Sequence, residues 1–223
     1  MISMLAGFAA GSIHVMTGPD HLAAVSPIAI DNRNSPSVVG LKWGIGHTSG
    51  VCLIGGLALL LREVIPLNFI SGYSERLVGI TLVFIGLWGI RKAYMKKALP
   101  HTHKHDGQVH AHPHIHHGPE EQAPAGTPIH THTAFGVGII HGFAGSSHIV
   151  GILPALAFAS RVDAVLYLLF FGIGTVLAMV AFSTVVGMVT RRLEIKGALV
   201  FQRMLAAFSG IAVCIGVYWI FNG

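Results

Sequence analysis

The stretch GSIHVMTGPDH at residues 11–21, followed by Pro27, decides how this chain folds. At an offset of 127 residues it aligns without gaps with GIIHGFAGSSH at residues 138–148, followed by Pro154, so that Gly, His, Gly, His and Pro recur in order. Two further matches keep this register within one residue, since GIG at 44–46 recurs at 172–174 and Arg76 is matched by Arg203. The set predicts an internal repeat, against the alternative that two glycine-rich helices resemble each other through composition.

The composition is that of a membrane protein. Of the 223 residues, 52% are hydrophobic and only 10% are charged, and the mean hydropathy is +0.67; a soluble domain carries about 25% charged residues. The net charge of +5 comes from short clusters between apolar runs, which indicates membrane topology and not nucleic-acid binding. Cys52 and Cys214 both lie inside apolar runs, where free thiols behave as small hydrophobic groups and a disulfide is not expected.

Apolar runs long enough to cross a hydrocarbon core need about 20 helical residues. Six runs qualify: 2–30, 38–61, 75–95, 134–159, 164–189 and 199–221. The first is too long for one upright helix and contains Gly18-Pro19 at its middle, so we expect it to be broken there. A cleavable signal peptide is the alternative for this run, but no basic residue precedes it.

Six crossings place both termini on one side of the membrane. Three of the 14 Lys and Arg residues, Arg62, Arg76 and Arg161, fall on the side of the termini, and the other 11 fall on the opposite side. Because positive residues mark the cytoplasmic side, we expect the termini outside and the 96–133 loop in the cytoplasm, with the chain in the cell inner membrane. Each half of the chain contains three crossings, an odd number, so the second half enters the membrane from the opposite face.

The predicted fold is therefore an all-α integral membrane protein with six transmembrane helices in two inverted-topology three-helix repeats. The first repeat spans residues 1–95, a histidine-rich loop without regular structure spans 96–133, and the second repeat spans 134–223. Helices one and four are expected to be broken or kinked, at Gly18-Pro19 and near Gly142 and Gly145. Inverted repeats are typical of transporters, whose substrate sites lie near the midplane where the repeats meet.

Polar residues inside the predicted spans are the candidates for function, because such groups are costly in a membrane and must face a partner or a cavity. The alternative for any one histidine is a neutral ring that hydrogen-bonds a carbonyl and aids helix packing. Six residues share this position within the spans: His14, Asp20, His21, His47, His141 and His148. Thr48, Ser49, Ser146 and Ser147 flank them and could bond the site or serve ordinary helix packing.

The spacing within each repeat is seven residues, from His14 to His21 and from His141 to His148. On a continuous helix the two backbones would be about 10 Å apart, too far for one ion with ligand bonds near 2 Å, unless the helix is interrupted. Antiparallel entry predicts two layers: His14 with His148, and His21 with His141, His47 and Asp20. Imidazoles with one carboxylate suit Ni²⁺, Co²⁺, Zn²⁺ or Cu²⁺ and not Mg²⁺ or Ca²⁺. Asp20 could bind the ion or orient an imidazole.

The loop holds the other ten histidines, interleaved with Pro, Gly and charge, so we expect disorder without metal. They are predicted to bind a transition metal loosely: His101, His103, His105, His110, His112, His114, His116, His117, His130 and His132. A purification tag is disfavoured because the run is internal, irregular and mixed with Asp106, Glu120 and Glu121. Loose binding beside a tight membrane site suggests a buffer or sensor of internal metal.

The run HVMTGPDHLAA at residues 14–24 resembles the membrane signature of the nickel/cobalt permease superfamily, and it is most similar to the UreH-type, urease-accessory branch. This chain has five residues between the first His and Asp-His, one more than the better-known uptake permeases, and its histidine-rich loop resembles the efflux branch. The resemblance implies that His14, Asp20 and His21 line the metal path. It also implies nickel or cobalt as the substrate, which spacing alone could not distinguish from zinc.

The sequence thus predicts a secondary permease for Ni²⁺ or Co²⁺, acting in uptake, and not an enzyme. It contains no GxxxxGK[ST] phosphate loop, so no ATP motor is indicated. Efflux with the loop presenting ions is the first alternative. The second alternative, a membrane metalloenzyme, is disfavoured because HExxH is absent. The third alternative is a metal-sensing membrane anchor that does not transport ions. Expected partners are the metal ion and membrane lipid, and could include a cytoplasmic metallochaperone; no cofactor is expected.

Overall fold

The computed structural model describes residues 1–61, 67–95, 100–105, 108–113, 129–143, 154–155 and 157–222. Within these ranges it describes the side chains of 1–53, 75–94, 132–143, 154–155, 157 and 158–222. Its described part contains seven helices and one two-stranded antiparallel sheet. The helices are α1 (Ile2–Thr17), α2 (Pro19–Asp31), α3 (Pro36–Leu61), α4 (Leu67–Met95), α5 (Ile129–Phe143), α7 (Arg161–Glu194) and α8 (Ala198–Asn222), and the strands are β1 (Pro100–His105) and β2 (Gln108–Pro113).

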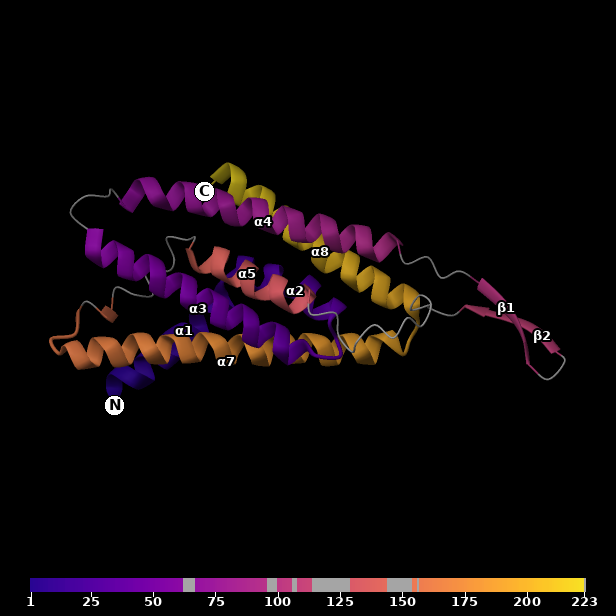
Figure 1. Ribbon diagram of the computed structural model, residues 1–223, viewed down its shortest axis with the longest axis horizontal. Coiled ribbons are helices and arrows are strands. Elements are labelled where there is room, and N and C mark those ends of the chain that lie inside the picture. Colours follow the sequence, from indigo (N-terminus) through magenta and orange to yellow (C-terminus); the bar gives the residue numbers. More distant parts are fainter. Residues whose placement is uncertain are drawn as a thin grey trace.

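The long helices run roughly along one axis, and both termini lie towards one end of the bundle while the β1–β2 hairpin extends from the other (Figure 1). Three pairs of helices make the most extensive contacts: α1 with α7, α3 with α5, and α4 with α8; α3 also packs against α7. The spans expected at 2–30, 38–61, 75–95, 164–189 and 199–221 correspond to described helices, with α4 beginning at Leu67. Of the span expected at 134–159, residues 134–143 belong to α5, which begins at Ile129, whereas 144–153, with the break expected near Gly145, lie outside the described residues.

The chain is a multi-pass membrane protein. Among the described residues, three helices are long and apolar enough to cross a membrane, namely Glu75–Tyr94 of α4, α7 and α8. Large apolar side chains such as Phe84, Leu169 and Leu177 are exposed on their outer faces. Because a water-soluble surface rarely carries apolar patches of this extent, these faces are suited to contact with lipid chains.

Helix α2 occupies the centre of the bundle and contacts each of the other described helices. It carries no charged residue between His21 and Asp31, and every residue from Ala23 to Ile30 is buried. A helix that is apolar on all sides is stable only where it is surrounded by other helices or lipid. The short second half of the broken first span is therefore held inside protein.

Glycines allow close approach of the helices at two positions that are 127 residues apart, Gly11 and Gly138. Gly11 of α1 packs against the carbonyl of Phe171 on α7, and Gly138 of α5 packs in the same way against the carbonyl of Trp43 on α3. At each position an added Cβ would lie 3.0 Å or less from backbone atoms of the facing helix. Small residues at such contacts let helices associate in lipid through close backbone packing.

A second pair of contacts joins α3 to α7. Gly44 faces Val176, where an added Cβ would lie 2.9 Å from the Val176 Cα, and Gly172 faces Thr48, where it would lie 2.6 Å from the methyl carbon. These partners are separated along the chain by the same interval: Gly44 to Gly172, and Thr48 to Val176, are both 128 positions apart.

The 96–133 segment contains the β1–β2 hairpin and the first residues of α5. The hairpin register pairs His101 with His112 and His103 with His110. Since alternate residues of a strand lie on one face, His101, His103 and His105 share a face of β1, in a segment that we expected to lack regular structure.

Candidate metal centre

The break between α1 and α2 creates the site. Gly18 has φ −79° and ψ 105°, an extended conformation that ends α1, and Pro19 then begins α2 at a position where its missing N–H is tolerated. His14 lies in the last turn of α1 and His21 in the first turn of α2. The predicted break at Gly18-Pro19 is confirmed, and it brings two rings seven residues apart to a centroid separation of 4.9 Å.

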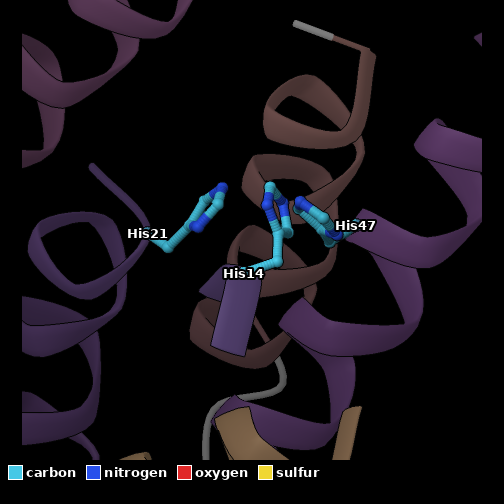
Figure 2. A group of neighbouring side chains, drawn as sticks. All are labelled: His14, His21 and His47. Atoms are coloured by element: carbon cyan, nitrogen blue, oxygen red, sulfur yellow. The ribbon is translucent and has the colours of Figure 1, made fainter. Parts of the chain in front are cut away.

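Three imidazoles from three helices converge beside this break. One nitrogen of each of His14, His21 and His47 lies within 4.8 Å of the others, and Figure 2 shows the rings pointing toward one another from α1, α2 and α3. The His47 ring is 5.7 Å from that of His14 and 5.1 Å from that of His21. An ion bound about 2 Å from each nitrogen holds its ligands no more than about 4 Å apart, so a shift of about 1 Å closes the set.

His141 of α5 extends the group on the side of His21, with the two ring centroids 6.1 Å apart. Its Nδ1 lies 3.1 Å from the carbonyl oxygen of Val137. Because a carbonyl can only accept, Nδ1 carries the proton and Nε2 keeps its lone pair. That Nε2 is buried and has no hydrogen-bond partner among the described residues, so it is available as a ligand atom.

Asp20 places a carboxylate beside the imidazoles. Its Oδ2 lies 3.7 Å from Nε2 of His21. The residue stands in the first turn of α2, where the helix dipole favours negative charge. The C-terminal end of α1, where carbonyl groups carry partial negative charge, meets the same break. The partial charges of the two helix ends at the break have opposite signs, so the negative charge near a bound cation would come from the Asp20 carboxylate.

The site is buried. His21, His47 and His141 are each 1% exposed or less, and His14 is half-buried. Two aromatic side chains border the rings: Trp43 stacks on His47 at 4.9 Å and 19°, and Phe171 lies 5.6 Å from His14. A buried set of imidazoles with one carboxylate fits a borderline divalent metal and lacks the oxygen-rich shell that Mg²⁺ or Ca²⁺ requires.

The structure brings together five of the six predicted site residues, and the sixth, His148, lies outside the described residues. The arrangement differs from the two predicted layers, because His14 joins His21 and His47 in one group. Of the flanking residues, Ser49 donates to the carbonyl of Ile45 within its own helix, 2.8 Å away. Ser146 and Ser147 lie outside the described residues. Of the loop histidines, His132 is exposed at the start of α5.

Sequence reasoning missed Trp43 and Phe171. A signal for Trp43 existed, since it precedes His47 by four residues and so shares its helix face. Phe171 is 128 positions after Trp43, the same interval that relates Gly44 to Gly172. Both aromatic residues lie in long apolar spans, where an aromatic ring ordinarily packs in the core, so neither was distinguished from its apolar neighbours.

Over residues 3–218 the sequence matches the protein family described as cytochrome C biogenesis protein transmembrane region. The chain belongs to this family. It is also 34% identical over 222 residues to the urease accessory protein UreH of Bacillus sp. (strain TB-90), covering 97% of this chain and 89% of that protein. The expected kinship with UreH-type proteins is thereby confirmed.

Two plant proteins are also similar to nearly the whole of this chain. They are the chloroplast proteins FOR GROWTH AND FERTILITY 2 and 1 of Arabidopsis thaliana, 32% and 31% identical over 97% of this chain. The chain spans little more than half of these relatives, 55% and 58% of their lengths. No solved structure matches the chain.

The donor atoms gathered in this member of the family are imidazole nitrogens and a carboxylate. Its two cysteines, Cys52 on α3 and Cys214 on α8, are free and exposed. Neither belongs to the group around His14, His21 and His47. The imidazole nitrogens of His14, His21 and His47 could hold a metal ion.

Proposed function

We propose that this protein is a permease that moves a divalent transition-metal ion across the membrane through the site at the α1–α2 break, and that it is not an enzyme. The observation that carries the proposal is the convergence of His14, His21 and His47, whose ligand atoms lie within 4.8 Å of one another inside a membrane protein. Placing the imidazoles of three different helices side by side inside a membrane protein is costly, and a shared ion would offset that cost.

The ion proposed is Ni²⁺ or Co²⁺. The ligands, His14, Asp20, His21, His47 and His141, would also accept Zn²⁺, since imidazole suits all three metals. Kinship with a urease accessory protein, together with the signature at residues 14–21 that resembles nickel/cobalt permeases, favours nickel or cobalt. Asp20 either binds the ion directly or orients His21 from 3.7 Å.

We propose further that residues 1–95 and 134–223 are inverted repeats, so that His148 is the counterpart of His21 and a further ligand. The repeated motifs support this, and so do the helix contacts. An exchange of the halves turns the α1–α7 pair into the α5–α3 pair, and both are extensive contacts. The same exchange turns Gly11 against Phe171 into Gly138 against Trp43, and both contacts are present.

The proposed direction is uptake across the cell inner membrane. The termini would lie outside, and the end of the bundle that carries the hairpin would face the cytoplasm. A charge that moves through a potential of 100 mV gains about 2.3 kcal/mol, so a divalent cation gains about 4.6 kcal/mol on entering a negative interior. Efflux is the second candidate, and the observation that favours it is the histidine-rich hairpin, which could collect ions at the end of the bundle from which it extends.

Accumulation of radioactive nickel in whole cells tests the proposal. Cells that express the protein should accumulate more nickel than cells with an empty vector, because the potential drives entry. His21→Ala should abolish the difference, whereas the matched variant His132→Ala removes one exposed imidazole of the ten in the loop and should keep most of it. Accumulation below that of cells with the empty vector would overturn uptake in favour of efflux. Accumulation equal to that of the empty vector, with both the wild type and His132→Ala, would overturn transport of nickel.

A further inference from the structure

Trp43 occupies a special position at the site. It lies in the N-terminal part of α3, one helical turn before His47, and its side chain is completely buried. The indole stacks on the His47 ring with a centroid distance of 4.9 Å and an interplanar angle of 19°. The same indole is 5.5 Å from the His21 ring and 5.8 Å from the His141 ring. One side chain therefore borders imidazoles from α2, α3 and α5.

The ring is held by the faces that it contacts. Its Nε1–H is buried and has no hydrogen-bond partner among the described residues, so no polar anchor to a described residue explains its orientation. The backbone beneath it is fixed, because Gly138 of α5 packs against the Trp43 carbonyl. The wall that the indole forms is thus set by the packing of α3 on α5, the helix that carries His141.

An imidazole binds a metal through a lone pair that lies in the plane of its ring. A partner stacked on that ring fixes the plane, and thereby the direction in which the lone pair points. It also prevents water from approaching through the stacked face. Groups that orient metal ligands through hydrogen bonds typically change metal affinity by 10–100-fold when they are removed, and we expect an effect of the same order from a stacked ring that fixes the imidazole plane.

Resting on the proposed function, we infer that Trp43 is a positioning residue for the metal site: its stacked indole holds His47 in the orientation that binds the ion and closes that side of the site to water. The aromatic face is the working part, since the indole N–H bonds no described residue. A phenyl ring should therefore substitute for it, whereas a branched aliphatic side chain of similar hydrophobicity should not.

Purified full-length protein in detergent tests this, with Ni²⁺ affinity measured by calorimetry and ligand geometry read from the visible absorption of bound Co²⁺. Trp43→Leu should raise the nickel Kd at least tenfold and change the Co²⁺ spectrum. Trp43→Phe should raise the nickel Kd by clearly less than Trp43→Leu and leave the Co²⁺ spectrum unchanged. Trp88→Leu, on α4, is the matched control and should leave both readouts unchanged.

A Trp43→Leu protein that binds nickel with the wild-type Kd and gives the wild-type Co²⁺ spectrum would overturn the inference. If it does not fold, the fluorescence of two conservative variants decides. Co²⁺ should quench emission strongly in Trp88→Phe, which retains Trp43, and weakly in Trp43→Phe; equal quenching would overturn the inference. Failure of the proposed function looks different: there the wild type binds no nickel, or His47→Ala binds it as the wild type does.

Discussion

Gly18→Ala is a sharp test of the helix break, because it changes no ligand. The φ and ψ of Gly18, −79° and 105°, are open to any residue, so alanine causes no backbone strain there. Its Cβ, however, would lie 2.9 Å from Cε1 of His21, 3.1 Å from Oδ1 of Asp20 and closer still to Nδ1 of His21. The His21 ring must therefore turn or move away from its present position.

The expected cost falls on metal binding and not on folding. In the unfolded chain alanine has less freedom than glycine, which alone stabilises the fold by about 0.4–1 kcal/mol and offsets part of the cost of moving one ring. For the ion, a displaced His21 removes an imidazole from the group within 4.8 Å. We expect the nickel Kd to rise about 10–100-fold, which corresponds to about 1.4–2.7 kcal/mol.

Calorimetry with Ni²⁺ and thermal unfolding of the purified protein measure the two effects separately. Gly136→Ala is the matched control, because Gly136 lies in α5 with nothing within 4 Å of an added Cβ; alanine there should leave the Kd unchanged and favour the helix by up to about 1 kcal/mol. A folded Gly18→Ala protein with wild-type nickel affinity would refute the view that the turn at Gly18 assembles the site.

Three other predictions follow from packing and charge. Gly138→Ala should lower stability by about 1–3 kcal/mol because α5 must move away from α3. Gly11→Ala should lower stability by a similar amount at the contact of α1 with α7. Thermal unfolding measures both effects, with Gly210→Ala as the control because an added Cβ there has open space. Arg33→Ala should cost about 1 kcal/mol, since its paired hydrogen bonds to Glu194 are only partly shielded from solvent; the double variant with Glu194→Ala should lose no more in the same assay. Alanine at the cross-strand histidines of the hairpin should reduce the number of nickel ions bound per chain while leaving the tightest site intact, as counted by calorimetry; these residues are His101, His103, His110 and His112.

Much of the helical framework could be predicted from the sequence, because a helix in lipid needs a long apolar run and little else. The prediction of 164–189 as a span corresponds to α7, and the break in the first span follows from the chemistry of Gly18-Pro19. The span predicted at 75–95 corresponds to the apolar part of α4, Glu75–Tyr94, and the helix itself begins earlier, at Leu67. Charged residues near the end of a helix interrupt the apolar pattern without ending the helix.

The members of the site were predictable and their arrangement was not. Polar residues within apolar spans identified His14, Asp20, His21, His47 and His141 as candidates. Which of them meet depends on the direction that the chain takes at Gly18, and residue spacing does not contain that direction. A ψ of 105° turns His21 back to within 4.9 Å of His14, whereas the expected layers kept these two rings apart.

The central position of α2 links the site to the rest of the bundle. Its first turn carries Asp20 and His21, and its buried length contacts every other described helix. At its far end, Asp31 accepts a hydrogen bond from Lys92 of α4, and the following turn joins α7 through Arg33 and Glu194. If the proposed ion draws the histidines together by about 1 Å and α2 moves with His21, that movement would press on every described helix, because packed interiors do not deform smoothly. Ion binding at the break would then be coupled to both halves through one short, buried helix.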